Sequence, residues 1–123
     1  MKVNFSTHGR ILVAAFEGEL DHLQAERLRG QIDSAYEKSS CKHIIFDMAN
    51  IGFMDSSGIG MIIGRYKNAE KRGGQIALAN MNDSISRLFE VSGLAKIVMR
   101  TNTVEDALLA LQADNKGGGH YEK

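Results

Sequence analysis

The chain has 123 residues and a mass of 13.5 kDa, which suits one domain of ordinary size and leaves no room for two. Hydrophobic residues make up 43% and charged residues 24%, the composition of a globular protein rather than a disordered one. The 15 basic residues balance the 15 acidic ones, so the basic surplus typical of nucleic-acid-binding proteins is missing. We therefore expect no direct contact with nucleic acid.

Membrane, disulfide and metal-binding classes are also disfavoured. The longest uninterrupted apolar run, Ile11 to Phe16, is far shorter than the roughly 20 residues that a membrane-spanning helix needs. The N-terminal segment lacks the apolar stretch of a signal peptide. The single cysteine, Cys41, cannot form an internal disulfide, and no group of His, Cys and Asp has zinc-site spacing. We expect a soluble, cytoplasmic protein with no membrane contact, no metal site and no cofactor.

The first 50 residues indicate two strands followed by a helix and a third strand. Residues 3–6 and 11–16 are expected to form a hairpin, and a turn is expected over 17–21. Asp21 can cap the next helix, because Gln24 follows three residues later as in a capping box. The recurrence of apolar side chains predicts that helix over residues 22–38. Its buried face is expected to carry Leu28, Ile32, Ala35 and Tyr36.

A nearly continuous apolar run predicts a central strand over residues 43–48, covered on both faces and followed by a turn at 49–52. The next helix is predicted from about 57 to 72, with the glycines at 73–74 as its terminator. A further strand is expected over 75–79. These elements alternate between strand and helix, as they do in α/β proteins.

The last third continues the alternation. A third helix is predicted from Asn82 or Asp83 to about Gly93, and a short strand over 97–99. Thr103 can cap a final helix, whose buried side chains are Val104, Ala107, Leu108 and Leu111. The chain is thus predicted to be one α/β domain over residues 1–113, with a mixed, mainly parallel sheet of about five strands and about four helices. The glycine-rich residues 114–123 are expected to form a flexible tail.

The most unusual segment joins the central strand to the second helix. It brings two hydroxyls, one carboxylate and two glycines together in Asp55, Ser56, Ser57, Gly58 and Gly60. A helix N-terminus stabilises an anion by about 0.3–1 kcal/mol at an exposed site. Serine and aspartate are also common N-caps, and glycine is common in tight turns. These residues alone therefore leave a purely structural role open.

The helix that follows has an unusual outer face. Its core face is expected to carry the apolar residues Ile59, Ile62, Ile63, Tyr66 and Ala69. Its other face then carries Ser57, Gly60, Met61, Gly64 and Asn68. Glycine in a helix costs about 1 kcal/mol relative to alanine, so two exposed glycines and a methionine indicate a surface that another molecule approaches. The alternative is that the glycines contact another element of the same domain.

Enzyme signatures do not match well. Gly58, Gly60 and Gly64 lack the spacing of a dinucleotide-binding loop, and no P-loop lysine follows them. Met54 stands where a serine-hydrolase elbow requires glycine, two residues before Ser56. None of the 4 histidines is an obvious base for a nucleophilic serine. We expect that the protein is not an enzyme, with a small serine hydrolase or a nucleotide-binding enzyme as the alternative.

Several segments together resemble one protein family. They are Gly18 to His22, Ile44 to Asp47, Phe53 to Gly60, Gly64 to Lys67 and Arg87 to Leu94. In identity and spacing they resemble the bacterial anti-sigma factor antagonists, small proteins of the STAS domain family, and most of all the sporulation type of endospore-forming bacteria. The resemblance covers about residues 3 to 112 and implies a STAS-type fold. Antagonists of a general-stress or other sigma factor and regulatory domains of anion transporters are the alternatives within it.

The resemblance implies a phosphorylation switch. In the family, the first serine after the aspartate, which is Ser56 here, is phosphorylated by an anti-sigma factor that is an ATP-dependent serine kinase. The unphosphorylated antagonist binds that kinase and displaces the sigma factor, and a serine phosphatase restores it. The residues alone do not decide between Ser56 and Ser57.

The same resemblance gives an expected docking surface for the kinase in its ATP- or ADP-bound form. It comprises Asp21, Asp55, Ser57, Gly58, Ile59, Gly60 and Met61. Periodicity assigns Ile59 to the core, but in the first helical turn it can also touch the partner. We expect the free protein to be a monomer.

Overall fold

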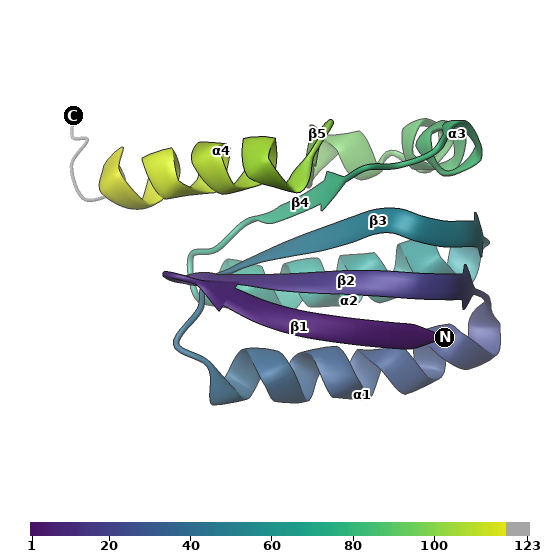
Figure 1. Ribbon diagram of the computed structural model, residues 1–123, viewed down its shortest axis with the longest axis horizontal. Helices are drawn as coiled ribbons and strands as arrows, with labels where there is room; N and C mark the ends of the chain where they lie inside the picture. The colour runs from purple at the N-terminus through teal and green to yellow at the C-terminus, as the bar shows by residue number, and fades with distance from the viewer. Residues whose placement is uncertain (118–123) are drawn as a thin grey trace.

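The computed structural model describes the backbone of residues 1–117 and the side chains of residues 1–113. Five strands in this range form one sheet in the order β1-β2-β3-β4-β5 (Figure 1). The strands are β1 (Lys2–His8), β2 (Ile11–Leu20), β3 (His43–Met54), β4 (Ile76–Ala79) and β5 (Met99–Thr101). The helices are α1 (His22–Lys38), α2 (Ser56–Lys71), α3 (Asp83–Ser92) and α4 (Val104–Gly117), with a short 3-10 helix at Leu94–Lys96.

The sheet is mixed, as predicted. β1 pairs antiparallel with β2, whereas β2, β3, β4 and β5 are mutually parallel. The carboxyl ends of these parallel strands therefore lie along one edge, where α1, α2 and α3 begin. This edge places residues that are more than 30 positions apart in the sequence next to one another.

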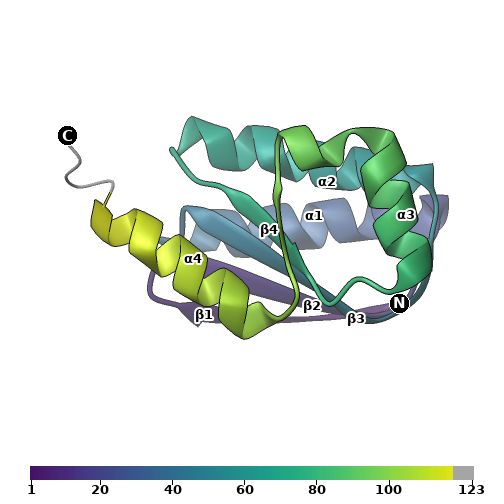
Figure 2. The same ribbon diagram turned by 90° about the horizontal axis from the view of Figure 1, so that it is seen from above.

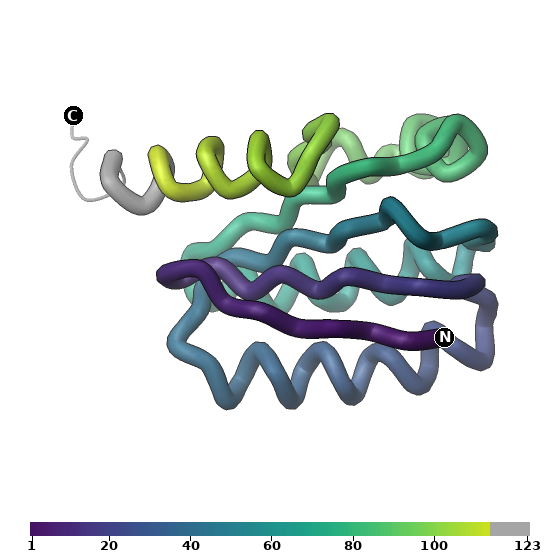
Figure 3. The backbone as a smooth tube through the Cα atoms, in the orientation of Figure 1, coloured from purple at the N-terminus to yellow at the C-terminus, as the bar shows by residue number. Residues whose placement is uncertain are grey.

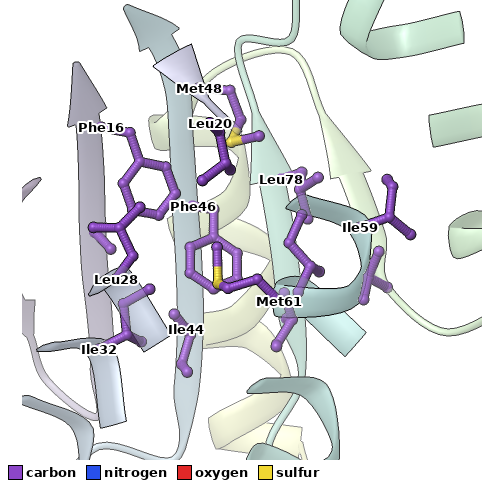
Figure 4. Packing of buried hydrophobic residues seen from close by; sticks show 14 of the residues in the cluster. Phe16, Leu20, Leu28, Ile32, Ile44, Phe46, Met48, Ile59, Met61 and Leu78 are labelled. Atoms are coloured by element: carbon purple, nitrogen blue, oxygen red, sulfur yellow. The ribbon is translucent and has the colours of Figure 1, made fainter. Parts of the chain in front are cut away.

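Helices cover both faces of the sheet. α1, α2 and α3 lie on one face, and α4 lies on the other (Figure 2). Because side chains alternate across a strand, Ile44 and Phe46 of β3 face the first layer and Ile45 faces α4. The rings of Phe16 and Phe46 stack with centroids 5.5 Å apart at the centre of the larger core (Figure 4). Both faces of β3 are thus buried, as its apolar run predicted.

Two predicted turns are instead strand. β2 continues through 17–20 and β3 continues through 49–54, because the two strands go on pairing with each other up to Leu20 and Met54. Register shifts interrupt this pairing on either side of Glu17 and Gly18, and Gly18 has φ 127°. The glycine and acidic residues that suggested a turn therefore mark an irregular stretch of a paired strand.

The predicted helix boundaries are close to those observed. α1 has the predicted bounds and Asp21 as its N-cap, and α2 begins one residue earlier than predicted, at Ser56. Gly93 ends α3 with φ 83°. The strand predicted over 97–99 is wrong by two residues: the 3-10 helix follows Gly93, and the strand pairs with β4 only from Met99.

Gly74 shows why a glycine follows α2. A Cβ atom at this position would clash with the carbonyl oxygen of Lys42, just before β3. That oxygen accepts a hydrogen bond from the Tyr36 hydroxyl at 2.7 Å, so α1, α2 and the start of β3 meet closely here. Burial raises the pKa of the Tyr36 hydroxyl, although the nearby Arg72 guanidinium opposes the shift.

The backbone trace places the start of β1 and the coloured part of α4 that is farthest along the chain at opposite sides of the molecule (Figure 3). α4 extends to Gly117, four residues beyond the predicted domain boundary at 113, and residues 118–123 of the predicted tail lie outside the described residues. Among the described residues, no helix combines the length and apolar character that crossing a membrane requires.

Candidate functional site

The candidate site is built on the paired ends of β2 and β3. Leu20 and Met54 are opposite each other in the parallel register, so the next residues, Asp21 and Asp55, also come close together. The backbone N–H of Asp55 donates to the carbonyl oxygen of Leu20 at 3.4 Å, which extends the pairing by one residue. The two predicted aspartates are therefore neighbours at the edge where two helices begin.

Each aspartate is the N-cap of a helix. Oδ1 of Asp21 accepts from the backbone N–H of Gln24 at 3.0 Å, and Oδ1 of Asp55 accepts from that of Ser57 at 2.9 Å. Such caps contribute about 1 kcal/mol each, because they satisfy N–H groups that a helix leaves unpaired. The carbonyl oxygen of Asp55 also accepts from the N–H of Gly58 at 3.0 Å. Asp55 thus fixes the first turn of α2.

The two serines that follow Asp55 differ in environment. Ser56 is the first residue of α2 and is exposed. Ser57 is half-buried, and its Oγ lies 3.4 Å from Nδ1 of His22, the first residue of α1. The structure therefore separates two hydroxyls that the sequence left equivalent: Ser56 is presented to solvent and Ser57 is turned toward α1.

Gly58 is required by packing inside the domain. A Cβ atom at this position would lie 2.5 Å from Cγ and 2.7 Å from Sδ of Met54, and 3.1 Å from Cδ2 of Leu20. Both neighbours are buried, so they have little freedom to move away. Ile59 is 7% exposed and belongs to the core, as periodicity predicted. Neither residue offers much surface to a partner.

Gly60 and Gly64 are different, because a Cβ atom at either position would have no neighbour within 4 Å. The alternative that these glycines contact another element of the same domain is therefore wrong. Gly60 is exposed and Gly64 is half-buried, one turn apart on the same side of α2. They leave open space into which another molecule can bring its backbone close to the helix.

The prediction that Met61 is exposed is wrong. Its side chain is 5% exposed and belongs to the larger core (Figure 4). α2 packs against α1 as well as against the sheet, so the flank that carries Met61 and Arg65 faces α1 rather than solvent. The thioether is flexible enough to fill the space between the two helices. Met61 therefore forms the floor, not the outer surface, of the predicted docking face.

Arg65 links the two helices. Its Nε lies 2.8 Å from Oδ1 of Asp33 in α1, and the two side chains form an ion pair. The same Oδ1 accepts from Nδ2 of Asn68 at 3.1 Å. Burial lowers the pKa of the Arg65 guanidinium, and the Asp33 carboxylate opposes that shift. These contacts hold α1 and α2 at a fixed separation.

A groove of about 320 Å³ runs between α1 and α2 beside the serines. It is lined by His22, Ala25, Glu26, Arg29, Ser57, Gly60, Met61, Gly64 and Arg65. Glu26 and Arg29 form an exposed ion pair with 2.9 Å between Oε1 and Nη2. The groove thus combines a polar rim on α1 with the open glycine side of α2.

Another hollow lies between the end of β3 and α3. It is lined by Met54, Ser84, Arg87, Leu88 and Val91. Val91 is 81% exposed, and Phe53 at the end of β3 is 48% exposed. Met54, Leu88 and Val91 give this hollow an apolar part.

Metal and hydrolase chemistry find no support in the described part of the chain. Residues 1–113, whose side chains the structure describes, contain no group of three or more His, Cys, Asp or Glu side chains arranged to hold a metal ion. Ser57 and His22 form the one serine–histidine contact near the site, but no carboxylate among the described residues hydrogen-bonds to that imidazole. A nucleophilic serine normally needs a base that a third group orients.

Comparison with known proteins identifies the family. The sequence profile of the STAS domain matches residues 2–107. The chain belongs to the STAS domain family. An anti-sigma F factor antagonist of Paenibacillus polymyxa is 37% identical over 112 residues, covering 91% of this chain and 96% of the relative. An anti-sigma-B factor antagonist of Bacillus subtilis is 32% identical over 81 residues, covering 66% of this chain and 72% of the relative.

Solved structures of anti-sigma factor antagonists are also similar to this STAS domain. The unphosphorylated form of the anti-sigma factor antagonist SpoIIAA has a TM-score of 0.79 and 30% identity, covering 91% of this chain and 97% of that chain. The phosphorylated form of the Bacillus SpoIIAA has a TM-score of 0.68 and 31% identity, covering 87% of this chain and 96% of that chain. The resemblance to anti-sigma factor antagonists of the STAS family is confirmed.

Sequence reasoning missed two residues of this STAS-domain site. The sequence pattern includes His22 only as the end of the family-like segment Gly18 to His22, and it does not point to Arg65 as a residue of the groove. The pairing of β2 with β3 brings His22 to Ser57, and packing of α1 on α2 buries Arg65. The one sequence signal was that Asp21-His22 and Asp55-Ser56-Ser57 each follow a strand.

The two kinds of glycine in α2 predict opposite changes in stability. Gly58→Ala should lower the free energy of unfolding by about 1–3 kcal/mol, because the new methyl group overlaps Met54 and Leu20. Gly60→Ala should raise it by up to about 1 kcal/mol, because the helix gains propensity without a clash. Chemical denaturation of both variants measures the difference. A Gly60→Ala protein as unstable as Gly58→Ala would contradict the open face described here.

Proposed function

We propose that this protein is an anti-sigma factor antagonist controlled by phosphorylation on Ser56. In its unphosphorylated form it binds an anti-sigma factor that is a serine kinase, in the ATP- or ADP-bound state, and thereby releases the sigma factor. The kinase phosphorylates Ser56 and so ends the interaction, and a serine phosphatase restores the active form. The protein acts in the cytoplasm, is a monomer when free, and binds rather than catalyses.

The observation that carries this proposal is the exposed hydroxyl of Ser56 at the start of α2, beside a helix face with open space at Gly60 and Gly64. A kinase needs an acceptor hydroxyl that reaches its active site, and a binding partner needs a surface that it can approach closely. Ser56 and Gly60 are one helical turn apart and provide both on one surface. The relatives named as anti-sigma factor antagonists, one of them seen phosphorylated, support this assignment.

The charges around Ser56 suit an electrostatic switch. A phosphate adds about −1.5 to −2 charges at neutral pH. The carboxylate of Asp55 already caps α2, and that of Asp21 caps the neighbouring α1, so the phosphate would join two negative groups at this edge. A free protein can tolerate this arrangement in water, helped by the N-terminus of α2. A partner that covers the edge removes the water and makes the same charge costly.

The sigma factor under control has two candidates. Identity is 37% to the anti-sigma F factor antagonist of Paenibacillus polymyxa and 32% to the anti-sigma-B factor antagonist of Bacillus subtilis. The first match also spans more of both chains. We therefore infer a role in sporulation, with control of a general-stress sigma factor as the second candidate. Binding of this protein to the two kinds of anti-sigma factor, measured side by side, distinguishes them.

Phosphate from ATP should be transferred to Ser56 and not to Ser57. In the presence of the cognate kinase, fragment mass spectra of the wild-type protein should place the phosphate on Ser56, since this hydroxyl is the exposed one. Ser56→Ala should lose nearly all labelling, whereas Ser57→Ala, the matched control, should keep it. Labelling of Ser56→Ala at the wild-type rate would overturn the assignment.

Gly60→Gln should prevent docking without harming the fold. A long side chain at this open position has room in the free domain and improves helix propensity, so stability should not fall. The same side chain would stand between α2 and a partner, and affinity for the kinase should fall by tenfold or more, about 1.4 kcal/mol. Titration calorimetry measures the affinity, and a thermal melt measures stability.

Gly30→Gln provides the matched control for this experiment. Gly30 is exposed in α1 and a Cβ atom there also has no neighbour within 4 Å, so the helix-propensity gain is the same. Unchanged affinity of Gly30→Gln together with weak binding of Gly60→Gln supports the docking surface. Equal affinities for the two variants would place the kinase elsewhere.

Phosphorylation should weaken kinase binding while leaving the fold in place. Burial of an uncompensated charge costs several kcal/mol, so the affinity should fall by about a hundredfold or more. Ser56→Asp should cause only part of this loss, because it adds about one charge. Ser34→Asp, an exposed change in the second half of α1, is the control for charge alone.

Amide NMR spectra of the modified and unmodified forms, paired with calorimetry against the ADP-bound kinase, measure both effects. Chemical-shift changes should be confined to the ends of β2 and β3 and the first turns of α1 and α2. Large changes across β4 and β5 would instead indicate a conformational switch. Unchanged affinity would remove phosphorylation from the mechanism.

A further inference from the structure

Two adjacent hydroxyls are available at the start of α2, yet they are held differently. Ser57 is half-buried and lines the groove between α1 and α2, with its Oγ 3.4 Å from Nδ1 of His22. Ser56, one residue earlier, is exposed, and none of its side-chain atoms makes a hydrogen bond within the described residues. The contact that distinguishes the two serines comes from α1, 35 positions away in the sequence.

We propose that His22 is a specificity residue for phosphorylation: it holds the Ser57 hydroxyl in the groove, so that Ser56 is the hydroxyl that the kinase receives. The proposal rests on the proposed function, since it concerns the phosphoryl transfer assigned there. It adds the first residue of α1 to a switch whose phosphate acceptor lies in α2. His22 acts through Ser57, and it is therefore a positioning residue rather than a catalytic one.

The position of His22 is fixed by the backbone. It follows Asp21, whose carboxylate caps α1, and it is the first residue of that helix. Ser57 follows the cap of α2 by two residues, and its own N–H is bound by Asp55. Because Leu20 and Met54 are paired, both helix starts are held at the same sheet edge. The imidazole and the Ser57 hydroxyl thus meet without a mobile loop between them.

The chemistry explains why such a contact affects acceptor choice. In the transfer, a serine Oγ attacks the γ-phosphorus of ATP, the bond to the β,γ-bridging oxygen breaks, ADP leaves and the hydroxyl proton passes to a base of the kinase. Ser57 must first turn out of the groove and lose its contact with Nδ1 of His22. This holds whether the hydroxyl donates to Nδ1 or accepts from it, since either arrangement occupies Oγ.

The test uses Ser56→Ala as the background, because it makes transfer to Ser57 measurable. The full-length protein is incubated with saturating cognate kinase and labelled ATP, and fragment mass spectra locate the phosphate. Adding His22→Ala should raise the rate of Ser57 labelling by about threefold to tenfold, the range expected for one exposed hydrogen bond. Saturating kinase separates this rate from any change in affinity.

Conservative variants provide the controls. His22→Asn places an amide atom close to the position of Nδ1 and should restore slow labelling, whereas His22→Gln reaches the position of Nε2 and should behave like His22→Ala. His8→Ala removes another exposed imidazole, one that lies 3.3 Å from Ser6 on β1, and should change nothing. A merely structural role of His22 would not give this order of variants.

A measurement without the kinase checks the contact itself. Proton–nitrogen correlation spectra of the imidazole rings should show a shift of the His22 Nδ1 resonance in Ser57→Ala, with no shift for His8. No shift at His22, or no rise of Ser57 labelling in the Ser56→Ala, His22→Ala protein, would overturn the inference. Wild-type protein that accepts no phosphate at all would instead overturn the proposed function.

Discussion

The parallel pairing of β2 with β3, maintained to their last residues, is the constraint on which the rest of the site depends. It places Leu20 opposite Met54, so Asp21 and Asp55 cap two helices that start side by side. Had either strand ended where the glycines suggested, the helix starts would have been separated by flexible turns. The register shifts near Gly18 interrupt the pairing only locally, and it continues to Leu20 and Met54. The exposed serine therefore stands on a rigid edge.

α2 has one side that packs inside the domain and one side that is left open. Ile59, Met61 and Ile62 are buried, and Arg65 pairs with Asp33 of α1, so one side of the helix is fixed to the domain. Gly60 and Gly64 contribute nothing to that packing and cost helix propensity of about 1 kcal/mol each. Both of these unfavourable glycines lie on the one side of α2 that is left open. A binding surface explains that pattern, whereas a purely structural helix would carry alanine, lysine or glutamate there.

Much of the fold could be predicted from the sequence, because local signals agreed with the final packing. Asp21 with Gln24 gave the start of α1, Gly93 gave the end of α3, and the apolar run of β3 gave a strand buried on both faces. The failures came from long-range contacts. Met61 was assigned to the outer face because periodicity cannot show that α1 covers that flank. The contact between His22 and Ser57 depends on strand register, which no local pattern contains.

The charge arrangement at this edge also bears on the proposed switch, in which one phosphate ends binding. The Asp55 carboxylate already occupies the N–H of Ser57 and offsets the positive end of the α2 dipole. A phosphate on Ser56 would therefore find only part of the compensation that a bare helix N-terminus gives an anion. Water can supply the remainder while Ser56 is exposed, but a partner over Gly60 cannot. In the proposed switch, the carboxylate that caps α2 would therefore also make the phosphorylated edge unfavourable to cover, so that stability and regulation would depend on the same group.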